Sequence, residues 1–335
     1  MRFGLRMCDW FGSVDNMVRL GVLAENNGFD SVWVSHDIFM RSSLVTLTAI
    51  ASSTKHVLLG NTILNPYTTN PSEIAMYLSA LDEFTKGRVL CGLSAGSIDY
   101  LDWLGLEHKK PLTRVKETVD VLRKLWAGEN AAFDGKEIKW SPESYMRFNQ
   151  HRKKIPIYIG GQGEKLLAYS GASGDGVLPL LHPPEFIDMA MERMKAGANA
   201  VGRDFSTVDV SGCVWLSISK DGEIADDALR KLIAYFGWQD AELMQSTIGL
   251  SRKDFLPIKE VWQKEGLDAA SKLVTDRMLD LAIHGKADDC IAKIEMMEKK
   301  GLKHISIGAP LGIDPEESVN LLGKYVLPYF NEKNK

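Results

Sequence analysis

A glycine-rich turn is the strongest candidate binding element in the sequence. Gly160, Gly161, Gln162 and Gly163 follow the apolar run IPIYI and are followed at once by a helical pattern. Glycines let the backbone approach an anion closely, and the N–H groups at a helix N-terminus bind phosphate. The turn lacks a full GxGxxG pattern, which argues against a Rossmann dinucleotide site. It predicts a site for a phosphate or phosphodiester, and the alternative is a tight turn that needs glycine only for geometry.

An ionisable pair, His36 and Asp37, follows the apolar run SVWV. Histidine exchanges a proton near neutral pH, and a carboxylate can act as an acid or a base when its pKa is shifted. Adjacent residues of a strand point to opposite sides, so the two side chains need not interact. Both are candidate catalytic residues. The alternative is a histidine at the rim and an aspartate that caps a helix.

Two further segments place small and polar residues after apolar runs. In NTILNPYTTNP, Thr62, Ile63 and Asn65 could contact a heteroaromatic ring, although Asn70 followed by Pro71 also reads as the start of a helix. In LSAGS, Gly96 and Ser97 could bind a ligand through the backbone and a hydroxyl group, or could serve packing alone.

Eight short apolar runs alternate with amphipathic segments of helical periodicity, and this order positions the four candidate segments. The pattern predicts one α/β domain over residues 1–335, a parallel (β/α)8 TIM barrel with insertions, with an open doubly wound sheet as the alternative. Barrel enzymes carry their active sites where strands end, which is where the candidate residues lie. The predicted strands are 2–8, 30–34, 57–60, 88–93, 155–159, 176–180, 208–218 and 304–307.

Two segments interrupt the alternation. Residues 130–153 contain FDGKEIKW, an Asp-Gly turn between alternating residues, and predict a hairpin insertion. Residues 223–273 have no strand-like run and predict a helical insertion. Helices are also expected over 275–283, 287–300 and 315–330.

Composition excludes several classes of protein. The chain of 335 residues has a net charge of −4 and no basic run, which argues against a nucleic-acid or membrane surface. No apolar run reaches the roughly 18 residues that span a bilayer. Its four cysteines are scattered, so we expect no metal site and reduced thiols in a cytoplasmic protein.

The four candidate segments, in this order, resemble the bacterial luciferase-like superfamily, and more closely its branch that uses the deazaflavin coenzyme F420. The most similar group is the F420-dependent methylenetetrahydromethanopterin reductases. The resemblance covers nearly the whole chain. It rests on TILNPYTTNP, on IGGQG with SGDGV, and on the C-terminal stretch VTDRML…DDCIAKIEMMEKKGLKHISIGAPLGIDPEESVNLLG.

The resemblance implies a luciferase-like barrel with a coenzyme ring across its mouth and a non-prolyl cis peptide at Thr62–Ile63. It also implies that Gly96 and the 160–163 turn lie along the ring and phosphate tail. This chain departs from the branch at three ionisable positions: the order His36-Asp37 is reversed, Ser97 replaces an acidic residue, and Arg6 replaces a carboxylate found in the methylene reductases.

The expected function is an F420-dependent oxidoreductase that transfers a hydride between the deazaflavin and a small organic substrate, with a methylene-tetrahydropterin as one candidate. One alternative is an FMN-dependent monooxygenase of the same superfamily. Another is a flavin-binding barrel without catalysis. An unrelated sugar-phosphate aldolase or isomerase lacks an obvious Schiff-base lysine. The family and the apolar helical segment 78–84 favour a homodimer.

Overall fold

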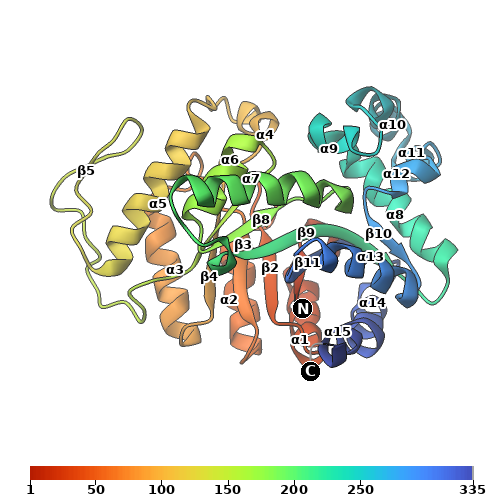
Figure 1. Cartoon of the computed structure of the whole chain (residues 1–335), viewed down its shortest axis with the longest axis horizontal. Helices are drawn as coiled ribbons and strands as arrows, with labels where there is room; N and C mark the ends of the chain where they lie inside the picture. The colour runs from red at the N-terminus through yellow and green to blue at the C-terminus, as the bar shows by residue number, and fades with distance from the viewer. Residues whose placement is uncertain (334–335) are drawn as a thin grey trace.

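The chain folds into a closed barrel of eight parallel strands, seen in a computed structural model that describes residues 1–333 (Figure 1). Each barrel strand pairs with the next one along the chain, and β11 closes the ring by pairing with both β9 and β1. The predicted (β/α)8 barrel is therefore confirmed, and the open sheet is wrong. The barrel strands are β1 Arg2–Met7, β2 Ser31–Ser35, β3 Leu58–Thr62, β4 Val89–Leu93, β7 Ile157–Gly161, β8 Gly176–Pro179, β9 Asp209–Ile218 and β11 His304–Leu311.

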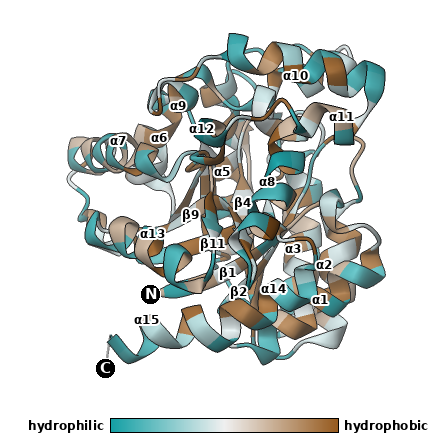
Figure 2. Ribbon diagram, turned by 90° about the vertical axis from the view of Figure 1, so that its right-hand side faces the viewer, coloured by the Kyte–Doolittle hydropathy of each residue, from teal (hydrophilic) through white to brown (hydrophobic). Residues whose placement is uncertain are grey.

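Helices cover the outside of the barrel, and their apolar sides face the strands (Figure 2). Local capping explains where several of them begin: Ser13 and Asn70 accept N–H groups of the first turn, and Pro71 takes the first position of α3. No helix within residues 1–333 is long and apolar enough to cross a membrane. The covering helices are α1 Val14–Asn26, α2 Ser43–Ser53, α3 Pro71–Thr85, α4 Ile98–Trp103, α5 Pro111–Ala127, α6 Glu164–Ser173, α7 Ile187–Ala200, α13 Ala287–Lys299, α14 Pro315–Leu321 and α15 Leu327–Lys333.

The two predicted insertions lie at opposite ends of the long axis (Figure 1). The first holds a small antiparallel hairpin, β5 Phe133–Asp134 and β6 Lys139–Trp140. The second is helical. It comprises α8 Gly222–Phe236, α9 Glu242–Ser246, α10 Arg252–Glu265 and α11 Leu267–Ser271, and α12 Asp276–Leu279 follows it.

Three expectations about elements need correction. Residue Ile283 is not helical but begins a ninth strand, β10 Ile283–Gly285, which pairs with the end of β9. The closing helix over 315–330 is interrupted by a π-helical turn, Leu322–Val326. The segment 78–84 offers less apolar surface than its composition suggests, because Leu78 and Leu81 face the core and Phe84 is its one exposed large apolar side chain.

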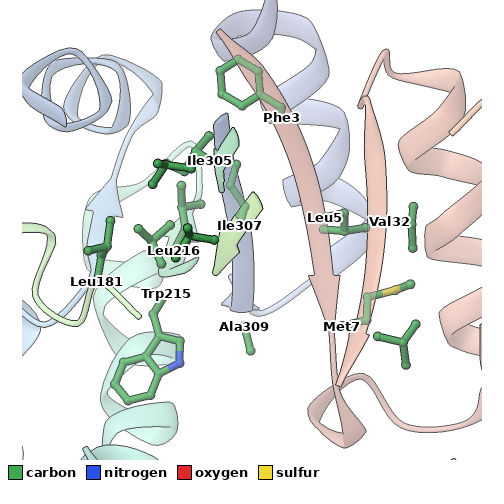
Figure 3. Packing of buried hydrophobic residues seen from close by; sticks show 14 of the residues in the cluster. Phe3, Leu5, Met7, Val32, Leu181, Trp215, Leu216, Ile305, Ile307 and Ala309 are labelled. Carbon is green, nitrogen blue, oxygen red and sulfur yellow. The ribbon is translucent and has the colours of Figure 1, made fainter. Parts of the chain in front are cut away.

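The hydrophobic core has two layers, because successive residues of a strand point to opposite faces. On β1, Phe3, Leu5 and Met7 are at most 1% exposed and belong to the layer between barrel and helices (Figure 3). The inner layer fills the barrel with Trp33, Leu90, Tyr158, Leu178 and Cys213. Gly60 makes room for it, since a Cβ there would lie 2.2 Å from the Trp33 ring. Above this packed interior, the ends of the strands leave space for a ligand.

Candidate functional site

A cavity of about 1020 Å³ opens at the C-terminal ends of the barrel strands. All eleven residues predicted from the sequence line it, although they come from four separate segments. The roles assigned to them individually remain predictions. These residues are His36, Asp37, Thr62, Ile63, Asn65, Gly96, Ser97, Gly160, Gly161, Gln162 and Gly163.

The glycine turn joins β7 to α6 at one edge of this cavity. Gly160 and Gly161 belong to the end of the strand rather than to the turn, and Gly163 is the N-cap of α6. Within residues 1–333 the backbone N–H groups of Glu164 and Lys165 donate no hydrogen bond to the protein. Lys165, which sequence reasoning did not single out, lines the cavity beside them. Free N–H groups, a helix N-terminus and a cation together can hold a phosphate group.

The end of β3 forms the opposite wall. The peptide bond Thr62–Ile63 is cis, as the resemblance implied. The Thr62 hydroxyl is buried and has no hydrogen-bond partner in the described chain. Gly160 packs directly against Ile63, since a Cβ on Gly160 would lie 3.1 Å from Ile63 Cγ2. A flat ring therefore finds an apolar wall and an unsatisfied polar atom here.

Asn65 and Gly96 continue this wall. Asn65 Oδ1 accepts the N–H groups of Tyr67 and Thr68, which fixes the loop after β3. Gly96 has a φ of +78°, and a Cβ there would lie 3.2 Å from the Asn65 side chain. Glycine is required at this position on both grounds. Ser97 is exposed and begins α4 without capping it through its side chain.

His36 and Asp37 both reach the cavity, but no contact joins their side chains. His36 Nδ1 accepts the Ser43 N–H at 3.3 Å, so the proton of the neutral ring lies on Nε2. Burial lowers the pKa of His36, which keeps the ring neutral near pH 7. Asp37 does not cap a helix. Its Oδ1 accepts only the N–H of Ile38, and burial raises its pKa to about 6.

Asp37 is therefore the carboxyl group best suited to proton transfer, because a pKa near the working pH permits both gain and loss of the proton.

Sequence reasoning missed the side of the cavity opposite α6. Arg6, His182, Trp215, Gln239 and Asp240 all line it. None of them follows a turn motif, and they meet only because β1, β8, β9 and the helical insertion converge. The one available signal was Arg6, which the resemblance singled out on the first strand as the replacement of a carboxylate.

Comparison with known proteins agrees with this geometry. Residues 9–304 match the family model of luciferase-like monooxygenases. The chain is 33% identical to a 5,10-methylenetetrahydromethanopterin reductase of Methanolobus tindarius over 91% of this chain and 93% of that protein. It is 30% identical to the Archaeoglobus fulgidus protein of the same name, again over 91% and 93%.

Among solved structures, the coenzyme F420-dependent tetrahydromethanopterin reductase of Methanopyrus kandleri superposes with a TM-score of 0.92. The two chains are 27% identical over 98% of this chain and 99% of the other. The family model covers most of the chain, and the relatives match it almost end to end. This chain therefore belongs to the luciferase-like monooxygenase family.

Proposed function

We propose that the chain is an F420-dependent oxidoreductase that transfers a hydride between the deazaflavin and a carbon atom of a small organic substrate. The observation that carries the proposal is the near end-to-end similarity to an F420-dependent reductase, with a TM-score of 0.92. The names of the two relatives make a methylene-tetrahydropterin the first substrate to test.

The residues present fit a coenzyme with a flat ring and an anionic tail. The free N–H groups of α6 and the ammonium group of Lys165 would hold the phosphate of the tail. The buried Thr62 hydroxyl, which lacks a partner, would bond to a polar edge of the ring. Ile63 and Gly160, which pack against each other, would form one apolar surface for a face of the ring, since Gly160 has no side chain to obstruct it.

F420 supplies the hydride chemistry when bound, and the protein supplies orientation and proton transfer. Asp37 would hold or release a proton at Oδ2, the carboxylate oxygen that the Ile38 N–H does not engage. His36, neutral and fixed through Nδ1 by Ser43, would donate a hydrogen bond from Nε2.

The test is a spectroscopic titration of the purified protein with F420 and with FMN, followed by a reductase assay with methylene-tetrahydropterin. We expect F420 to bind at least tenfold more tightly than FMN. Tight FMN binding without F420 binding, together with oxygen consumption, would indicate an FMN-dependent monooxygenase instead. Coenzyme binding without turnover on any substrate would support a non-catalytic barrel.

We also propose that the protein is a homodimer of the cytoplasm. Exposed apolar side chains on two neighbouring helices support the dimer: Val45 on α2, and Met76 and Phe84 on α3, are 48–62% exposed. All four cysteines are free thiols, which is typical of a reducing compartment. Light scattering should give about twice 37.3 kDa, and Val45→Glu should shift the mass toward one chain. A monomeric wild-type protein would refute the dimer.

A further inference from the structure

Arg6 lies at the floor of the cavity because of the alternation on β1. Phe3, Leu5 and Met7 point toward the helices, so Arg6 points into the barrel. Its guanidinium group passes over β11 at Gly308, where a Cβ would lie 2.6 Å from Arg6 Nη2. The same Nη2 donates a hydrogen bond to the carbonyl oxygen of Val214 on β9 at 3.2 Å. Gly308 therefore leaves the space that the Arg6 side chain occupies at the base of the cavity.

Within residues 1–333 the charge of Arg6 has no acidic partner. Its Nε is buried and makes no hydrogen bond within the described chain. Two acidic residues on this side of the fold are engaged elsewhere, since Asp240 pairs with His182 and Asp9 pairs with Arg41, and no ion pair joins Arg6 to Asp37 within residues 1–333. A guanidinium group carries five donors, and a cation left without a counter-charge in a protein interior is costly. A site of this kind is complete only when an anion enters it.

His182 stands next to this cation. Besides burial, the charge of Arg6 is close enough to contribute to the lowered pKa of His182. Trp215, which follows the Val214 carbonyl that Arg6 contacts, stacks on the His182 ring with centroids 4.0 Å apart. His182 is 2% exposed, its Nδ1 lies 3.3 Å from Asp240 Oδ1, and its Nε2 has no partner within residues 1–333. Burial lowers the pKa of His182, so the ring is neutral, donates from Nδ1 to Asp240 and offers a lone pair at Nε2.

We propose that Arg6 and His182 form a substrate subsite for a 2-hydroxy acid or its close analogues, in which Arg6 binds the carboxylate and His182 Nε2 accepts a hydrogen bond from the hydroxyl group. A 2-hydroxy acid matches both groups: the guanidinium of Arg6 can bind its carboxylate, and the Nε2 lone pair of His182 can accept a hydrogen bond from its hydroxyl group. Trp215, Leu232 and Phe236 line the same side and would cover an apolar substituent. This inference rests on the proposed function, because the substrate would share the cavity with F420.

A matched set of three ligands tests the subsite in the full-length protein, with and without F420. Mandelate carries both groups, phenylacetate lacks the hydroxyl, and 1-phenylethane-1,2-diol lacks the carboxylate. Calorimetric titration should rank mandelate about 10- to 100-fold tighter than the diol and about 3- to 10-fold tighter than phenylacetate. Equal affinities for all three, or no binding of any, would overturn the proposal.

Two substitutions separate this subsite from the coenzyme site. Arg6→Met should lower mandelate affinity to that of the diol and leave F420 affinity within twofold of wild type, whereas Lys165→Met should weaken F420 and spare mandelate. If Arg6→Met folds poorly, Arg6→Lys replaces it in the test. This variant keeps the charge and should retain part of the preference for mandelate.

Loss of F420 binding in Arg6→Met would assign the guanidinium to the coenzyme and refute the substrate role. If F420 fails to bind the wild-type protein while the mandelate ranking holds, the coenzyme proposal falls and the subsite stands.

Discussion

Asp37 is a carboxyl group of the cavity whose protonation changes within the working pH range. Burial raises its pKa to about 6. We predict that Asp37→Asn lowers kcat by a factor on the order of 10²–10⁴, the usual contribution of a general acid or base. The wild-type pH–rate profile should show an inflection near pH 6 that the variant lacks. Asp227→Asn, on the exposed side of α8, is the matched control and should leave the profile unchanged.

The same rise in the pKa of Asp37 means that the ionised carboxylate destabilises the folded protein. A carboxyl whose folded pKa is raised favours the folded state below its ordinary pKa of 3.8 and loses that contribution as the pH rises through about 6. Asp37→Asn should therefore be more stable than wild type by about 1–2 kcal/mol at pH 8, after allowance for solvent screening. The gain should vanish at pH 3.5. Urea denaturation at the two pH values measures it, and a variant less stable at pH 8 would contradict the assigned environment.

Residues next to turn motifs were predictable from the sequence, and residues brought in by barrel closure were not. Gly96 and Gly160 could be identified from the sequence because a backbone that approaches a ligand closely or turns sharply favours glycine. His182 and Asp240 are 58 residues apart and belong to different elements. Their pairing depends on how the helical insertion settles on the barrel, which local sequence patterns do not specify.

At the scale of elements, one carboxylate of α5 binds the turn of the hairpin β5–β6. Glu117 accepts the N–H groups of Lys136, Glu137 and Ile138 at 2.7–2.9 Å. Burial alone would raise the pKa of Glu117, but these three bonds outweigh it, and the net pKa lies below its ordinary value. Glu117→Gln should cost about 1–3 kcal/mol at pH 7, because an amide offers one acceptor oxygen in place of two.

Hydrogen exchange of residues 133–140 should speed up in Glu117→Gln and stay unchanged in Glu129→Gln, an exposed residue near the end of α5. The stability that Glu117 contributes is present above its ordinary pKa of 4.5 and is lost as the pH falls through the lower folded value. The difference between variant and wild type should accordingly shrink below about pH 4. A deficit that persists undiminished at pH 3 would show that packing, and not charge, anchors the hairpin.

The elements themselves were largely readable because their periodicity is long and regular. The hairpin around Gly135 and the helix that starts at Pro71 carry explicit turn and cap signals. β10 escaped prediction because it spans three residues and exists only by pairing with the end of β9. The end of β7 was misplaced for a related reason: Gly160 and Gly161 look like a turn, but their pairing with Leu178 and Pro179 of β8 extends the strand.

At the scale of the whole molecule, the binding site exists only in the closed barrel. Its predicted coenzyme contacts come from the ends of β3, β4 and β7. The ring of strands is continuous between β8 and β9 through two paired positions, Gly176 with Asp209 and Val177 with Val210, and a bridge between Leu180 and Cys213. An unfolded chain presents none of this arrangement. A ligand that contacts several strand ends must therefore stabilise the entire fold rather than a single loop.

F420 at 100 times its dissociation constant should stabilise the folded protein by about 2.7 kcal/mol. For a domain of this size we expect a rise in Tm of about 3–5 °C. FMN at the same concentration should raise Tm by at most about 2 °C, because a tenfold weaker affinity leaves at most about 1.4 kcal/mol of stabilisation. Lys165→Met should lose most of the F420-dependent rise while keeping the Tm of the free protein, since Lys165 is exposed. Equal shifts with both coenzymes would mean that the cavity recognises a generic ring and phosphate, and the choice of F420 would have to be abandoned.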